Sequence, residues 1–432
     1  MDNINDILKT LEEYLKVNKP KYLYNQSFVP GISQVLYSGP YWDEREIMAA
    51  MTTFITGKWV VAGENVHKFE SAFSKMFGTK YSHMVNSGSS ANLVLIAALK
   101  KYFGWKDGDE IIVSPVGFPT TISAIVQNGL KPVFVDIEYK TLNFDVKLIE
   151  NKITSRTVGI FVSPVLGNPP DMDFIEKLSI QYNFKVIGDS CDSMGTKWNN
   201  KHLSDYYVAS SYSFYPAHHI STGEGGMIST NIEELKKLFV SFSWWGRDCY
   251  CVGSANLLSC GTCGNRFDKW LDTYDGIIDH KYIFTTMGYN LKPMDLQGSI
   301  GLVQLSKFEE IDRKRKQSKS TIEAIVLNYV LGLKGVTVLD NSDTCWFGTP
   351  FICEDKILKD RLVAFLEVNK IQTRNYFAGN ILLHPAYEHL DDYKNYPNAN
   401  DVLNKIFFLG AAPHYDNNVF EYVENVMKTW KN

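Results

Sequence analysis

Residues Phe184-Lys185-Val186-Ile187-Gly188-Asp189 form a short apolar run that ends on a carboxylate. Three similar runs precede it, at 109–114, 131–136 and 158–162. Amphipathic segments fill the gaps, at 120–128, 145–152 and 172–182. Short strands that alternate with helices in this way predict βαβ units with parallel strands. The sequence therefore predicts an α/β fold with a mainly parallel central sheet covered by helices.

The rest of the chain surrounds this pattern. A helical periodicity covers 4–17, and a Pro-, Tyr- and Gly-rich segment after it predicts an extended arm. We also expect a long helix over 293–325. The predicted organisation is an N-terminal helix and arm (1–40), a large domain (41–325) with a Cys-rich insertion (244–285), and a smaller C-terminal α/β domain (326–432).

Composition describes an ordinary globular protein. Of 432 residues, 45% are hydrophobic and 21% are charged, and the net charge is −4. This charge predicts neither a nucleic-acid partner nor an anionic membrane surface. No apolar run approaches a membrane span, and the first residues lack the pattern of a signal peptide. We therefore expect a cytoplasmic protein without disulfides.

Two polar segments lie where the predicted fold would bind a ligand. The turn Asn86-Ser87-Gly88-Ser89-Ser90 precedes an apolar helix, and the backbone amides at such a helix start suit a phosphate. The same turn could also be an ordinary helix cap. Asp189 ends a strand, and ligands of parallel sheets lie beyond the C-terminal strand ends. Its alternative role is to cap the next helix.

The segment Ser213-Phe214-Tyr215-Pro216-Ala217-His218-His219-Ile220-Ser221-Thr222-Gly223-Glu224-Gly225-Gly226 is the most specific in the chain. It resembles the cofactor-lysine segment of the DegT/DnrJ/EryC1/StrS sugar aminotransferases, which have the fold-type-I transferase fold and use pyridoxal phosphate (PLP). The resemblance extends from about residue 40 to 425. His218 takes the place of the lysine. An imidazole cannot form a Schiff base, but it can move a proton near neutral pH. We therefore expect a non-covalently held cofactor, as pyridoxamine phosphate (PMP).

The resemblance implies roles for further residues. Gly88, Ser89 and Ser213 would contact the phosphate, Asp189 the ring nitrogen, and Phe118 would stack on the ring. Without the resemblance, Phe118 would be assigned to the core. Asn290, in Gly288-Tyr289-Asn290-Leu291-Lys292, matches an asparagine that reaches the phosphate of a neighbouring subunit. This match implies a homodimer with shared active sites.

Four of the seven cysteines lie between 249 and 263, namely Cys249, Cys251, Cys260 and Cys263. Such a cluster predicts a metal site, and its local spacing suits zinc as well as a [2Fe-2S] centre. Cys191 lies two residues after Asp189, close to the expected cofactor ring. Because a structural zinc has no reason to lie there, its position favours an electron donor.

This arrangement resembles the iron–sulfur 3-dehydrases that make 3,6-dideoxy sugars. The resemblance implies four ligands, Cys191, Cys249, Cys251 and Cys263, the last in Cys263-Gly264-Asn265-Arg266-Phe267. Cys260 could replace Cys263. Asp192 and Tyr215 follow the dehydrase pattern as well. Cys345 and Cys353 have apolar neighbours and are expected to be inert buried thiols.

The implied activity is PMP- and [2Fe-2S]-dependent removal of the C3 hydroxyl from a nucleotide-linked 4-keto-6-deoxyhexose, with CDP as the favoured nucleotide. His218 would be the general base, and Asp189, Asp192 and Tyr215 would assist it. An NAD(P)H-dependent flavin/iron–sulfur reductase or a ferredoxin would supply electrons. Three alternatives remain: a PMP-dependent 3-dehydratase without a redox cluster, a sugar aminotransferase, and a non-catalytic, zinc-stabilised binding protein.

Overall fold

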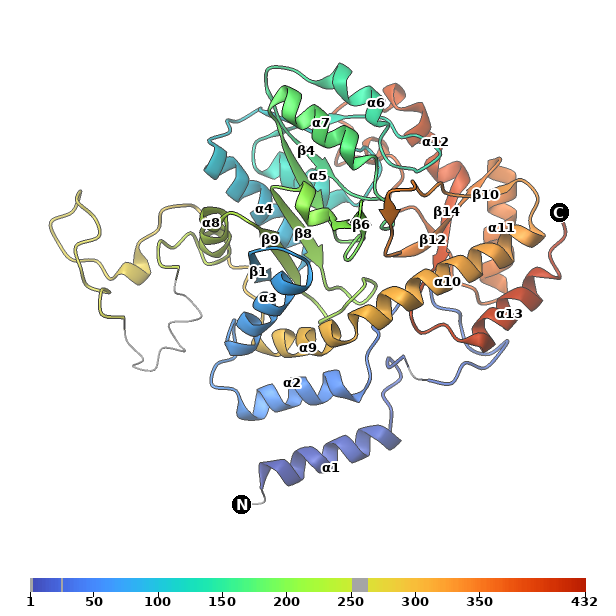
Figure 1. Cartoon of the computed structure of the whole chain (residues 1–432), viewed down its shortest axis with the longest axis horizontal. Coiled ribbons are helices and arrows are strands. Elements are labelled where there is room, and N and C mark those ends of the chain that lie inside the picture. The colour runs from blue at the N-terminus through green and yellow to red at the C-terminus, as the bar shows by residue number, and fades with distance from the viewer. Residues whose placement is uncertain (1–2, 25, 251–262) are drawn as a thin grey trace.

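The computed structural model describes residues 3–24, 26–250 and 263–432 (Figure 1). Its main sheet has seven strands in the order β1-β9-β8-β5-β4-β2-β3. All neighbouring pairs are parallel except the two that involve β9. The strands are β1 (Tyr81–Val85), β2 (Glu110–Val113), β3 (Lys131–Phe134), β4 (Thr157–Val162), β5 (Lys185–Asp189), β8 (Ala209–Ser213) and β9 (Gly226–Thr230). The prediction of a mainly parallel sheet is confirmed.

Helices cover both faces of this sheet. Successive strand residues point to opposite sides, and here the residues on both sides are apolar. Ile111 of β2 packs in the core that includes α4 (Gly88–Phe103), α5 (Pro119–Gln127) and α8 (Glu233–Ser243). Its neighbour Ile112 packs in the opposite core with α6 (Val146–Ile149) and α7 (Met172–Tyr182). Strands buried on both faces explain the continuous apolar runs of the sequence.

Further helices lie beside the sheet, along its β1 side. Figure 1 shows α1 (Ile4–Val17), α2 (Glu44–Thr56), α3 (Glu64–Met76) and α9 (Asp295–Ser306) on this side of the molecule. The expectation of one helix over 293–325 was wrong, because α9 ends at Ser306 and α10 (Phe308–Tyr329) begins after the single residue Lys307. The Lys307 ammonium lies 2.6 Å from Glu46 of α2 and 3.0 Å from Asp43, its N-cap, and these ion pairs attach the junction to α2.

A second, antiparallel sheet follows α10 in the chain. Its order is β10-β12-β14-β13, with β10 (Leu333–Gly335), β12 (Gly348–Cys353), β13 (Arg374–Asn375) and β14 (Ile406–Gly410). The helices of this part are α11 (Lys356–Val368), α12 (Pro397–Lys405) and α13 (Asn417–Met427). A small third sheet joins β6 (Lys197–Trp198), β7 (Lys201–His202) and β11 (Ser342–Asp343).

We propose that the large domain spans 41–325 and the small one 326–432, after the arm of 1–40. Side chains of the C-terminal half of α10, such as Val326, pack in a core with Phe351 and Leu362. In Figure 1 the described part of the Cys-rich insertion projects from the body beside α8. Within the described ranges, no helix is both long enough and apolar enough to cross a membrane.

Candidate active site

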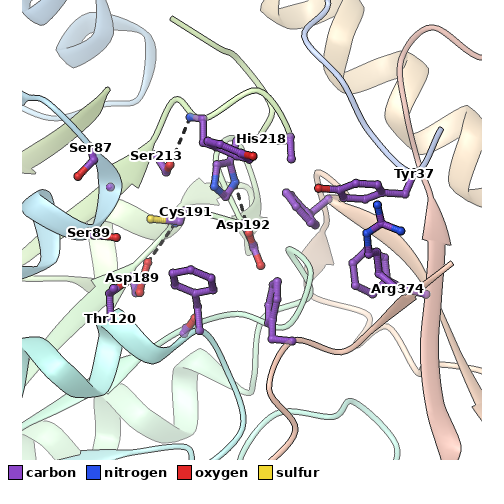
Figure 2. Close-up of a pocket in the computed structure, with 18 of the residues that line it drawn as sticks. Tyr37, Ser87, Ser89, Thr120, Asp189, Cys191, Asp192, Ser213, His218 and Arg374 are labelled. Atoms are coloured by element: carbon purple, nitrogen blue, oxygen red, sulfur yellow. Dashed lines mark hydrogen bonds and ion pairs between the residues drawn. The ribbon is translucent and has the colours of Figure 1, made fainter. Parts of the chain in front are cut away.

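A cavity of about 630 Å³ lies at the C-terminal ends of β5 and β8. The central sheet, the four-stranded antiparallel sheet and the N-terminal arm all contribute residues to it (Figure 2). Its lining comprises Tyr37, Ser87, Gly88, Ser89, Phe118, Thr120, Ser163, Asp189, Cys191, Asp192, Ser213, Tyr215, Ala217, His218, Glu224, Phe347, Arg374, Asn375, Phe377 and Phe408. The cavity therefore lies where parallel sheets bind their ligands.

The start of α4 forms an anion cradle at one end of the cavity. Ser87 caps the helix, since its Oγ accepts a hydrogen bond from the Ser90 amide at 3.1 Å. The amides of Gly88 and Ser89 belong to the first turn, where a helix supplies no acceptor. A Cβ on Gly88 would come within 2.5 Å of Ser213 Cβ, so only glycine allows this close approach. The segment is therefore an ordinary helix cap and also an anion cradle, and the free amides of this cradle fit a phosphate.

Asp189 is a buried carboxylate at the end of β5 that lines the cavity. Its Oδ2 accepts hydrogen bonds from Asn92 Nδ2 at 2.8 Å and from Thr121 Oγ1 at 2.6 Å, and its Oδ1 accepts one from the Cys191 amide at 3.3 Å. All three donors are neutral. Because this buried charge has no cationic partner among the described side chains, a protonated ring nitrogen fits the site. No helix follows Asp189 directly, so it caps none.

Sequence reasoning missed the two side chains that hold Asp189. Asn92 is a buried polar residue one turn into α4, directly before the apolar run 93–99, and Thr121 lies in the first turn of α5. Ser211 Oγ in turn donates a hydrogen bond to Asn92 Oδ1, so that Ser211, Asn92 and Asp189 form one hydrogen-bonded chain. A buried polar residue in an apolar helix was the available signal.

Two aromatic side chains lie in the cavity with large exposed fractions. Phe118 is 52% exposed and Tyr215 is 49% exposed, and both line the cavity. The alternative assignment of Phe118 to the core does not hold. The Phe118 ring meets that of Phe377 edge-on at 6.0 Å, which leaves its faces for a flat ligand.

His218 and Asp192 face each other in the cavity wall. His218 Nδ1 lies 3.4 Å from Asp192 Oδ1, and both side chains are largely buried (Figure 2). Burial raises the pKa of Asp192, while His218 acts to lower it. Because Nδ1 faces the carboxylate, Nε2 is the nitrogen left for a ligand. None of the lining residues is a lysine.

His219 has a different environment. It is buried, and its Nε2 lies 3.0 Å from the Cys345 carbonyl oxygen. Burial lowers the pKa of His219 well below its ordinary value, so it remains neutral and serves packing.

The predicted metal ligands are only partly within the described residues. Cys191 lines the cavity, and burial raises the pKa of its thiol well above the ordinary value. Cys249 is buried and Cys263 is half-buried. Cys251 and Cys260 lie outside the described residues. Among the residues that are described, no three His, Cys, Asp or Glu side chains form a group that could hold a metal ion.

The remaining predicted positions lie apart from this cavity. Asn290 does not line it, but pairs with Trp244 in a β-bridge and accepts a hydrogen bond from Lys292. Cys345 and Cys353 are buried, as expected.

The fold and the cavity define a PLP-dependent enzyme of fold type I, and the comparisons give its family. Residues 42–428 match the model of the DegT/DnrJ/EryC1/StrS aminotransferase family, and the chain belongs to this family. It is an enzyme of nucleotide-sugar modification that uses PLP or PMP.

Relatives cover nearly the whole chain. The lipopolysaccharide biosynthesis protein RfbH of Salmonella typhimurium is 33% identical over 97% of both chains. The dTDP-4-dehydro-2,6-dideoxy-D-glucose 3-dehydratase of Saccharopolyspora spinosa is 36% identical over 92% of this chain and 86% of that protein. A solved structure of the E. coli GDP-4-keto-6-deoxy-D-mannose-3-dehydratase with bound hydrated PLP is 28% identical over 91% of this chain and 100% of that one, with a TM-score of 0.79.

Proposed function

We propose that the protein is a PMP-dependent 3-dehydratase that removes the C3 hydroxyl of a nucleotide-linked 4-keto-6-deoxy sugar. The observation that carries this proposal is His218, which stands opposite Asp192 in a cavity whose lining contains no lysine. An aminotransferase needs the lysine amine to hold PLP between half-reactions, and an imidazole cannot replace it. The dTDP- and GDP-sugar 3-dehydratases among the relatives support the same choice.

The residues present fit the coenzyme. The amides of Gly88 and Ser89, with Ser213, would hold its phosphate, Asp189 its ring nitrogen, and Phe118 its face. Bound PMP supplies an amine that condenses with the C4 ketone and a ring that withdraws electrons.

His218 and Asp192 would handle the proton. Asp192 fixes the imidazole through Nδ1, so Nε2 accepts a proton at the coenzyme carbon and can return one to the departing C3 oxygen. Tyr215 lies beside this base, with its ring 6.4 Å from the imidazole. Burial of the pair keeps the proton from exchanging freely with water.

The opposite end of the cavity suits the nucleotide. Arg374 lies over the ring of Tyr37 at 4.1 Å and donates a hydrogen bond to the Thr373 carbonyl oxygen, and none of the ion pairs among the described residues includes it. An uncompensated guanidinium beside an aromatic ring fits a diphosphate and an adjacent flat base. The dTDP and GDP relatives leave the nucleotide open, and CDP remains a prediction from the sequence.

The test compares wild type with His218→Asn. Each is incubated with PMP and CDP-, dTDP- or GDP-linked 4-keto-6-deoxyhexoses, and mass spectrometry follows loss of the C3 hydroxyl. We expect His218→Asn to slow the reaction by about 10²- to 10⁴-fold, the usual worth of a general base. His389→Asn, at an exposed histidine, is the control. Undiminished turnover in His218→Asn, or an amino-sugar product, would contradict the proposal.

A second candidate is the cluster-dependent 3-dehydrase, in which electrons from a [2Fe-2S] centre complete the deoxygenation. The observation that favours it is Cys191, whose side chain lines the cavity beside Asp189. Among the residues that the structure describes, the cysteines do not form a group of ligands. The solved structures with PLP favour the version without one.

The two versions differ in what they consume. Without a cluster, the amine nitrogen of PMP is released as ammonia, and glutamate must renew it in each turnover. With a cluster, anaerobic reconstitution should give about two irons and two sulfides per chain, and turnover should require a reductase or ferredoxin with NAD(P)H. Glutamate-dependent turnover in iron-free protein would exclude the cluster version.

We also propose a homodimer in which the Asn290 loop meets the partner's site. Large apolar side chains near this loop are exposed, including Tyr282, Phe284 and Met287. Such an apolar surface favours a protein interface. Sedimentation should give a dimer, and a monomer with full activity would contradict this part.

A further inference from the structure

Arg315 of α10 is fully buried, with 0% of its surface exposed. Its guanidinium bonds to main-chain carbonyls. Nη1 donates to the carbonyl oxygens of Trp346 and Phe347 at 3.2 Å each, and Nη2 donates to those of His218 at 2.8 Å and Ala217 at 3.5 Å. None of the ion pairs in the described part of the chain includes Arg315, and its Nε has no hydrogen-bond partner there. Burial lowers the pKa of Arg315 to about 10, which still leaves it charged at neutral pH.

The four carbonyls belong to two separate segments. Ala217 and His218 lie in the turn after β8. Trp346 and Phe347 directly precede β12 of the four-stranded antiparallel sheet. The Phe347 ring packs against the His218 imidazole with centroids 5.2 Å apart. Arg315 thus joins the backbone that carries His218 to the backbone that carries its packing partner.

This arrangement is costly for stability alone. The guanidinium of Arg315 loses its hydration on burial. Among the described residues, no carboxylate lies within salt-bridge distance, although Asp192 and Asp312 are near enough to raise its pKa, and neutral carbonyls restore only part of the loss. An apolar side chain would fill the same space without that cost. The planar guanidinium, however, can donate hydrogen bonds to several carbonyl oxygens at fixed angles. Neither an apolar side chain nor an ammonium can do this.

We propose that Arg315 is a positioning residue for His218: it fixes the turn so that the imidazole keeps its distance to Asp192 and its direction into the cavity. The inference rests on the proposed function, since it concerns the geometry of the same base. Arg315 does not line the cavity and would not touch the substrate. Its loss should therefore change kcat and leave the KM for the nucleotide sugar nearly unchanged.

The experiment uses Arg315→Met and Arg315→Lys of the full chain, with two readouts. The first is the ¹³Cε1 NMR signal of His218 in protein without PMP, assigned with His218→Asn. We expect this signal to shift and broaden in Arg315→Met, and less so in Arg315→Lys. The second is steady-state turnover, where we expect kcat to fall by about 100-fold in Arg315→Met, the cost of misplacing a reacting group by about 1 Å. Arg315→Lys should recover part of that loss.

Lys307→Met is the matched control. Lys307 is a buried cation at the start of the same helix, but its partners are Glu46 and Asp43. We expect this variant to lose stability and to keep the His218 signal and the kcat of the folded protein. If Arg315→Met does not fold, Arg315→Lys decides by the same readouts.

Wild-type kcat and an unshifted His218 signal in the folded Arg315 variants would overturn the positioning role. A kcat loss equal to that of Lys307→Met would do the same. Full activity of His218→Asn would instead overturn the proposed function, so the two failures are distinguishable.

Discussion

His218 Nδ1 lies 3.4 Å from Asp192 Oδ1, and both groups are held in the wall of the same cavity. This contact decides which imidazole nitrogen is available to a ligand. It also ties the titration of a buried carboxylate to the group that we expect to move protons.

Asp192→Asn should raise stability at neutral pH and lower activity. The pKa of Asp192 is raised above 3.8, mainly by burial. Between that ordinary value and the raised one, the folded protein binds more protons than the unfolded chain, so wild type loses stability as pH rises through this window. Asparagine removes that loss. Thermal unfolding of both proteins from about pH 4 to about pH 7 checks this linkage.

The same variant tests the orientation of His218. We expect kcat to fall by about 10- to 100-fold, the usual cost of losing the partner that orients a functional histidine. Equal pH profiles of stability in the two proteins would contradict the raised pKa of Asp192, and equal kcat would contradict its role in orienting His218.

Arg374→Ala should weaken binding of the nucleotide sugar. Loss of a charge-assisted contact to a diphosphate typically costs about 1.5–3 kcal/mol, so we expect KM to rise by about 10- to 100-fold. The kcat should change little, because Arg374 lies away from His218 in the cavity (Figure 2). Arg361→Ala is the control, since Arg361 lies over the Trp430 ring at 5.1 Å, outside the cavity. A fall in kcat at constant KM would refute a binding role.

Thr121→Val should weaken the coenzyme site without disturbing the fold. Valine preserves the shape of the side chain but removes the donor to Asp189. We expect PMP affinity to fall by about 10-fold, as for the loss of one hydrogen bond to a charged group. Fluorescence titration with PMP measures it. The control is Thr349→Val, which removes the buried hydrogen bond from Thr349 Oγ1 to the Gly410 carbonyl oxygen in the four-stranded antiparallel sheet. It should leave PMP affinity unchanged. Equal effects of the two variants would refute a specific link to Asp189.

Lys292 should titrate unusually low for a lysine. Burial, together with the nearby Arg247, lowers the pKa of Lys292 from 10.5 to about 8. The charged form therefore costs stability below that value, and the cost disappears as pH rises from about 8 towards 10.5. NMR of reductively ¹³C-methylated protein should show one lysine signal with a midpoint near 8, absent in Lys292→Met. A midpoint near that of Lys237, a partly exposed lysine of α8, would contradict this.

The main sheet was predictable because its strands are local, apolar and separated by amphipathic helices. The division of 293–325 was not, because Lys307, the residue between the two helices, is buried against Glu46 and Asp43, which are distant in sequence. Long-range ion pairs leave no periodic signal.

The site residues that belong to a sequence motif, such as Gly88, Asp189 and His218, were predictable. The residues that hold them in place were not. Asn92 and Thr121 reach Asp189 only after α4, α5 and β5 pack together. Arg315 lies 97 residues after His218, and nothing local marks an arginine whose partners are carbonyls. Tyr37 and Arg374 meet only because the arm and the small sheet come together.

The lining without a lysine has a consequence for the protein in the cell. A coenzyme that is not tethered can leave after each cycle, so the active fraction follows mass action with the free vitamin B6 pool. Dilution or dialysis should empty the protein. Because only the folded chain offers the pocket, its resistance to heat should rise with coenzyme concentration.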